Sequence, residues 1–203
     1  MKIIRLVKQL NNTETGNGNT HESYILIPSD LDVSDLFETR DEPIDFYDLS
    51  SGELFQIRKT VGRETRIVGF GDYYSMYDLA AGDEIILEKV IKKDSIEYTI
   101  TNFKNKNSIV AQKLGQNFEI LRGIGHQVEW HNIDNSFSVE FVEKKKKRSD
   151  SPVMTDIYKL IVKGNDIDYK YKYQNMVILD LENNKVNDRK SYAWKKYVFE
   201  MED

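Results

Sequence analysis

The chain contains no cysteine, so it can form no disulfide and offers neither a thiol nucleophile nor a thiolate metal ligand. With only three histidines, His21, His126 and His131, a multi-histidine metal site is not expected. No apolar run is long enough to span a bilayer. Met1 to Arg5 begins a strand pattern instead of a signal-peptide core, so we expect a cytoplasmic protein.

What is present is an ordinary globular composition. The 203 residues are 31 % charged, with a net charge of -5 and a pI near 5.4. This length predicts a single domain over 1–203 that can bury a core. The net negative charge argues weakly against a nucleic-acid partner. Local clusters of charge matter more than the net charge, because salt screens the interaction of each exposed charge beyond about 8–10 Å.

Short alternating segments separated by turn residues predict a mainly β fold, a barrel or a sandwich. Between 108 and 122 the pattern fits a strand, a helix or both, and 41–51 is acidic and turn-rich. Two short helices are expected at 32–37 and 73–79. The expected strands are 2–10, 23–28, 53–61, 66–70, 84–91, 95–101, 127–130, 136–142, 157–162, 168–181 and 192–199.

A long polar loop, Asn11 to Glu22, lies between the first two expected strands. It is rich in amide, hydroxyl and glycine groups, which suit contact with a polar surface. A loop of this length is either functional or disordered. A dinucleotide-binding turn is disfavoured because a strand follows instead of a helix. A calcium loop would need more carboxylates than Glu14 and Glu22.

A second segment, 53–70, is expected to form a hairpin with its turn at 62–65. The tip and flanks of the hairpin carry Arg58, Lys59, Arg63 and Arg66, opposed there only by Glu64. Exposed charges are normally just solvated. However, the planar arginine fork suits guanine and phosphate, and one antiparallel barrel could carry both loops on the same side. Together the loops predict a DNA-binding surface.

Three other patterns have simpler explanations. Glu143 and Lys145, with Asp134 upstream, have the E-x-K spacing of a metal-dependent nuclease, but in a lysine-rich segment we favour coincidence. His126 and His131 flank Trp130 and are expected to be structural or on the surface. The segment Tyr169–Tyr173 alternates tyrosine with lysine, which on a strand predicts core tyrosines and solvated lysines, or a surface that touches the DNA backbone.

Three segments, in this order, resemble a known family. Lys8 to Pro28 is similar to the amino-terminal arm of the B-three-like recognition domains of restriction endonucleases such as EcoRII and BfiI. Glu64 to Gly71 resembles that family's second motif, and Leu79 to Asp83 a turn shared with plant B-three-type domains. The similarity covers roughly the first half of the chain. Within the expected single domain, 1–103 is the matched part and 104–203 holds the remaining strands.

The resemblance implies a seven-stranded open pseudobarrel with two short helices, extra carboxy-terminal strands, and two arms that clasp the DNA major groove. Thr13-Glu14 replaces the family's Asn-Asp, and Glu22 replaces a glutamine, so it can accept but not donate a hydrogen bond. The implied first-arm residues are Thr15, Gly16, Asn17, Asn19, His21 and Glu22. Those of the second arm are Lys59, Arg63, Glu64, Thr65 and Arg66, with Arg5, Lys8 and Arg58 on the DNA backbone.

The resemblance further implies the recognition or effector module of a type II restriction endonuclease of a prokaryotic cell, with CCWGG-type sites as the class of target. No catalytic or metal-binding residue and no cofactor is expected in this chain. Cleavage with Mg²⁺ would belong to a separate nuclease domain, fused or paired. The partner is then double-stranded DNA, without a membrane. Two alternatives stay open: a small Mg²⁺ nuclease using Glu143 and Lys145, and a non-catalytic protein-interaction barrel.

Overall fold

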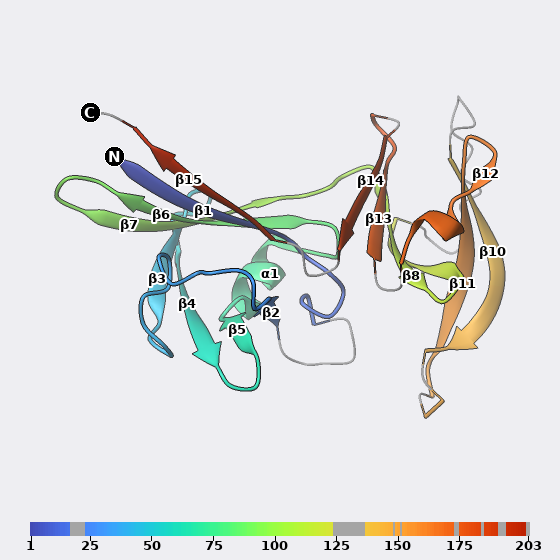
Figure 1. Ribbon diagram of the computed structural model, residues 1–203, viewed down its shortest axis with the longest axis horizontal. Helices are drawn as coiled ribbons and strands as arrows, with labels where there is room; N and C mark the ends of the chain where they lie inside the picture. The colour runs from blue at the N-terminus through green and yellow to red at the C-terminus, as the bar shows by residue number, and fades with distance from the viewer. Residues whose placement is uncertain are drawn as a thin grey trace. The chain divides into compact units, whose positions relative to one another are not determined.

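The computed structural model describes residues 1–16, 23–123, 137–147, 149–150, 152–172, 175–183, 185–190 and 194–201 (Figure 1). The chain divides into two compact units. The first comprises Met1–Asn105 and Tyr192–Asp203, and the second comprises Lys106–Ser191. Each unit has its own cluster of buried apolar side chains. Along the chain, the second unit is inserted into the first, and the single recognition domain over 1–203 stays a prediction.

The first unit is one eight-stranded sheet in the order β15-β1-β6-β7-β3-β4-β5-β2. Neighbouring strands are antiparallel except β3 and β7. The mainly β, open pseudobarrel expected from the sequence is confirmed: seven strands precede residue 104, and β15 is added from the end of the chain. The strands are β1 (Lys2–Gln9), β2 (Tyr24–Ile27), β3 (Ile44–Asp48), β4 (Leu54–Val61), β5 (Thr65–Val68), β6 (Glu84–Ile91), β7 (Ile96–Phe103) and β15 (Trp194–Glu200).

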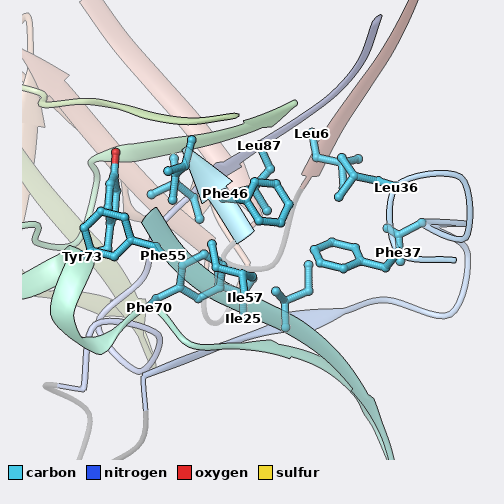
Figure 2. Close-up of a cluster of buried hydrophobic side chains, with 14 of the residues drawn as sticks. Leu6, Ile25, Leu36, Phe37, Phe46, Phe55, Ile57, Phe70, Tyr73 and Leu87 are labelled. Atoms are coloured by element: carbon cyan, nitrogen blue, oxygen red, sulfur yellow. The ribbon is translucent and has the colours of Figure 1, made fainter. Parts of the chain in front are cut away.

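The sheet curls so that its two edge strands meet. Trp194 at the start of β15 donates its indole N–H to the Leu26 carbonyl of β2, at 2.9 Å. Apolar side chains from β1 to β7 point into the curl and form one cluster, against which Trp194 of β15 packs; Figure 2 shows part of this cluster. Phe55 and Tyr73 meet edge to face with ring centroids 5.0 Å apart. Burying such rings is the main favourable term in forming this body, at about 1.5–3 kcal/mol per side chain.

Helix α1 (Gly71–Tyr77) covers this core, and the helix expected at 73–79 is thus confirmed, but it begins and ends two residues earlier. Its Tyr73 and Tyr74 are buried. The helix expected at 32–37 is wrong: these residues make a single turn, closed by a hydrogen bond of 2.9 Å from Phe37 N–H to the Val33 carbonyl. One turn is too short to repay helix nucleation, and Leu36 and Phe37 are held by burial in the core instead.

Strand β3 lies in the segment that the sequence indicated as a turn. Asp48 ends it and accepts hydrogen bonds from Ser51 N–H and Oγ, at 3.0 and 2.6 Å, and from the Tyr77 hydroxyl of α1. Burial alone would raise the pKa of Asp48, but these hydrogen bonds favour the carboxylate and bring the pKa below its usual value. One side chain therefore shapes the β3–β4 turn and fixes the helix to the sheet.

The second unit is an antiparallel sheet in the order β10-β11-β9-β8-β13-β14, with β12 paired to β11. Its strands are β8 (Ser108–Leu114), β9 (Asn117–Arg122), β10 (Phe137–Lys146), β11 (Met154–Val162), β12 (Asn165–Asp166), β13 (Asn175–Asp180) and β14 (Lys185–Lys190). The segment 108–122 is therefore a β-hairpin. The strand expected over 168–181 is only partly right, because Asp168–Lys170 is a 3-10 turn, η1, that leaves Tyr169 74 % exposed. No helix in the described residues is long and apolar enough to cross a membrane.

Candidate nucleic-acid interface

The candidate surface is the outward face of strands β4, β5 and β2. Residues that alternate inward along these strands, such as Ile57, Ile67 and Ile25, are fully buried. The residues between them point outward, and the register aligns them in two rows. One row is Thr60, Arg66 and Leu26; the other is Arg58, Val68 and Tyr24.

The two loops singled out from the sequence join this face at its opposite ends. Tyr24, the first residue of β2, pairs with Val68, whereas Ile27, the last, pairs with Thr65. The polar loop enters β2 at Tyr24, and the turn of the β4–β5 hairpin lies beside Ile27. Three residue steps of a strand separate these positions by about 10 Å. The chain of the polar loop therefore joins the face at one end, and the hairpin turn lies at the other.

The second arm, the β4–β5 hairpin, carries three outward or tip arginines. Arg58 and Arg63 are exposed, and neither has a hydrogen-bond or ion-pair partner within the described part of the chain. Arg66 instead lies over the Tyr24 ring, 4.1 Å from its centroid, and donates to Glu64 at 3.0 Å. Thr65 begins β5, between Val61 and Ile27. The hairpin thus combines two unpaired cations with one arginine in a fixed orientation.

Lys59 differs from its neighbours because it alternates to the inward side of β4. Its Nζ donates to the Phe37 carbonyl at 2.6 Å, and its own carbonyl accepts from Asp41 N–H at 2.8 Å. These contacts bind the segment after the 33–37 turn against the hairpin. That segment also brings Arg40, which pairs with Asp41 and donates to the Val61 carbonyl. Sequence reasoning missed Arg40, because only the hydrogen bonds to Lys59 and Val61 show that 40–41 lies beside β4.

The root of the first arm is a built turn. Asn11 Oδ1 accepts from Glu14 N–H, and Glu14 Oε2 accepts from Asn11 N–H, both at 3.0 Å, which is the reciprocal arrangement of a capping box. The Thr15 hydroxyl folds back on the Asn12 carbonyl at 3.1 Å. Gly16 takes a left-handed φ of 79°, which glycine adopts without strain. The other expected residues of this arm, Asn17, Asn19, His21 and Glu22, lie outside the described residues.

Beneath this turn lies a buried ion pair. Lys8 Nζ is 2.7 Å from Glu14 Oε2, and both side chains are almost completely buried. Burial lowers the pKa of Lys8 and raises the pKa of Glu14, with the mutual attraction opposing both shifts. The expectation that Lys8 contacts the DNA backbone is therefore wrong. Lys8 points inward from β1, on the same side as the buried Leu6 and Leu10. Its ammonium group holds the arm in place through Glu14.

The turn at 79–83, the third motif of the resemblance, supports the same root. Gly82 N–H donates to the Leu10 carbonyl, and Leu10 N–H donates to the Asp83 carbonyl, both at 2.8 Å. Asp83 is fully buried, and its carboxylate accepts from Ala80 N–H at 3.0 Å and from Asn105 N–H at 2.8 Å. Two motifs that are far apart in the sequence thus form one structural element around Leu10.

The remaining candidates are dispersed. Arg5 is paired with Glu88 at 2.5 Å and lies under the ring of Phe199 in β15, so a contact with DNA would compete with both. Glu143 and Lys145 lie on the exposed edge strand β10. In the described ranges, no group of three or more histidine, aspartate or glutamate side chains could hold a metal ion. Asp134, His126 and His131 lie outside those ranges.

Comparison with known proteins finds a similar solved structure. No family model and no curated protein matches the chain. The structure is similar to a chain of the Arabidopsis FUS3-DNA complex, with 20 % sequence identity and a TM-score of 0.35. The similarity covers 48 % of this chain and 94 % of that one.

Proposed function

We propose that this protein binds double-stranded DNA sequence-specifically, through the outward face of β2, β5 and β4 and the two loops that border it. The observation that carries the proposal is the placement of Arg58, Arg63 and Arg66 on one hairpin of an otherwise acidic protein. The face is about 10 Å long between its bordering loops, and the major groove of B-DNA is about 12 Å wide. The two loops could therefore follow the walls of one groove.

The chemistry of the two arms suits the two kinds of DNA contact. Arginine donates in a bidentate fork to O6 and N7 of guanine, and the amides and the histidine expected on the first arm are also groups that pair with base edges. Arg63 and Arg66 are assigned to bases, since one is at the hairpin tip and the other is held at the centre of the face. Arg58, at the edge of the face, is assigned to phosphate, which fixes register without reading sequence.

The three motifs support a narrower proposal, that the chain is the recognition or effector module of a type II restriction endonuclease. Cleavage would then be performed by a separate nuclease domain with Mg²⁺, either fused or paired. CCWGG-type sites are the first targets to test. The finding that the first and third motifs share one buried hydrogen-bond network gives a physical reason for their occurring together.

The first test is selection of duplexes from a random pool by the purified chain, followed by affinity measurements on the enriched and the unselected duplexes. Arg63→Ala should weaken binding to the enriched duplex by roughly 5- to 150-fold, the value of one good base contact, with a much smaller loss on random duplex. The matched control is Lys93→Ala, which removes an exposed cation from the β6–β7 turn of the same unit.

The two outcomes that count against the proposal are distinct. An equal loss on both duplexes would make Arg63 a phosphate contact and remove it from sequence reading. Failure of the wild-type chain to retard any duplex at low salt would reject DNA binding itself and favour the protein-interaction barrel.

A further inference from the structure

One arginine on the candidate face differs from the others in having its guanidinium oriented from two sides. Arg66 and Tyr24 lie diagonally across the β5–β2 pair, since Arg66 is opposite Leu26 and Tyr24 is opposite Val68. Diagonal neighbours of this kind are within reach of an aromatic ring and a long side chain. The guanidinium carbon lies 4.1 Å from the centre of the Tyr24 ring, at cation–π distance.

The second support comes from within the hairpin. Glu64 Oε2 accepts from Arg66 Nη2 at 3.0 Å and from Nε at 3.3 Å, so one carboxylate oxygen receives two donors of the fork. The Arg66 side chain stays 36 % exposed and that of Glu64 49 % exposed. The contacts with Tyr24 and Glu64 thus fix the plane of the Arg66 guanidinium and leave part of it accessible to solvent.

We propose that Tyr24 and Glu64 are positioning residues that hold Arg66 ready to read one base pair. This inference rests on the proposed function, and it assigns to Tyr24 a role in specificity. A free arginine would lose rotamer freedom on binding, whereas a held one has lost it already, and a bidentate contact tolerates little error in the plane of the fork. Glu64 also neutralises the charge of Arg66, which lowers attraction to phosphates and leaves geometry to decide the contact.

The experiment is the same duplex selection, performed with the full chain and four variants, with base preference read at every position. Arg66→Ala identifies the base pair that Arg66 reads. Tyr24→Leu, which removes the ring, should relax preference at that base pair by roughly 2- to 5-fold and leave the other positions unchanged. Tyr24→Phe keeps the ring and should behave as wild type. Glu64→Gln should relax the same base pair and raise affinity for unselected random duplex.

The outcomes separate this inference from the proposed function. The inference is overturned if Tyr24→Leu weakens the base preference at all positions together, as a simple loss of stability would. It is also overturned if the preference relaxes at a different base pair. A change at a different base pair in Glu64→Gln would make Glu64 a reader in its own right and overturn its positioning role. If wild type and Arg66→Ala enrich the same consensus, the inference fails while DNA binding stands. If wild type enriches no sequence, the proposed function fails and takes this inference with it.

Discussion

At the scale of single residues, the least expected feature is a lysine in the core of a β-strand. Lys8 lies in the first expected strand, and the family resemblance implied that it contacts the DNA backbone. The structure places its Nζ against Glu14 and the Gln9 carbonyl, at 2.7 and 2.6 Å. Nothing in a single sequence distinguishes these two uses of a lysine, because the deciding partner approaches only when the loop folds back.

This pair yields a prediction for stability. Lys8→Met removes the cation and leaves the buried Glu14 carboxylate without its counter-ion, so the free energy of unfolding should fall by about 3–5 kcal/mol. Adding Glu14→Gln removes the stranded charge and keeps an acceptor for Asn11 N–H, so the double variant should recover a large part of the loss. Urea unfolding of the single and double variants gives the coupling between the two sites.

The comparison has a control on the same strand. Lys2, whose side chain is 45 % exposed, pairs with Glu200 at 3.5 Å, and Lys2→Met should change stability by no more than about 0.5 kcal/mol. Additive effects of Lys8→Met and Glu14→Gln would show that the pair is energetically unimportant. The arm root would then depend on the capping box alone.

At the scale of elements, the β4–β5 hairpin depends on one glycine. Gly69 follows β5 with a φ of +107°, and a Cβ built there would lie 2.2 Å from the Gln56 carbonyl oxygen. Gly69→Ala must therefore move the backbone of β4 or of β5. We expect a loss of at least about 2 kcal/mol in the free energy of unfolding, combining backbone strain with the clash.

Gly62, in the turn of the same hairpin, is the matched control. A Cβ there meets nothing within 4 Å and its φ is not positive, so Gly62→Ala should be tolerated within about 0.5 kcal/mol. Chemical denaturation of both variants measures the difference in their free energies of unfolding. Equal stability of the two would mean that the strands separate at Gly69 without cost, and that the candidate face is less rigid than its register indicates.

The elements also show what a sequence can reveal. Strands β6 and β7 were predicted to within two residues at each end, because β6 contains the apolar run Ile85–Leu87 and β7 alternates over Ile96, Tyr98 and Ile100. Strand β3 was missed because Ile44–Asp48 is short, acidic and close to Pro43. The strand expected over 168–181 is wrong at its start because the sequence there alternates without forming a strand. Alternation there is only a coincidence of composition, and the Asp166 carboxylate accepts from Asp168 N–H at 2.9 Å and starts a turn.

The site shows the same division. The two loops and the arginine hairpin could be found from composition and spacing. The Tyr24–Arg66 contact, the place of Arg40 and the shared network of Leu10 and Asp83 could not, since each depends on contacts between segments distant in sequence. Lys59 was assigned to the arm for its charge, and only the alternation of β4 shows that it points toward the Phe37 carbonyl.

At the scale of the whole molecule, the second unit is an insertion between two strands of the first. β7 ends at Phe103, opposite Glu84, and Glu84 is opposite Gln9 in β1. β15 begins at Trp194, opposite Lys8 in the same strand. The chain therefore leaves and re-enters the first unit at one end of its sheet. Three strand spacings separate these two points, about 14 Å. No composition shift marks this insertion, because 192–199 reads as an ordinary strand that follows the others.

This arrangement predicts that the first unit folds without the insertion. Replacing 106–191 by about eight Gly/Ser residues spans the gap and keeps the register of β15 on β1, which extends over Lys2 to Lys8. The shortened chain should unfold cooperatively and retain its selected duplex. Of the two tryptophans, only Trp194 then remains, and its indole bond to Leu26 makes its fluorescence a direct probe of β15 docking.

The control for this experiment is a chain that ends at Asn105. It lacks β15, so it exposes the edge of β1 and loses the indole contact that joins the two edges of the curl. It should be less stable than the linked form, as judged by far-UV circular dichroism during urea unfolding. A linked chain whose Trp194 emits as in the unfolded state would show that β15 needs the second unit to reach β1. The insertion would then be part of what holds the sheet, and the two-unit description would have to be abandoned for a single cooperative body.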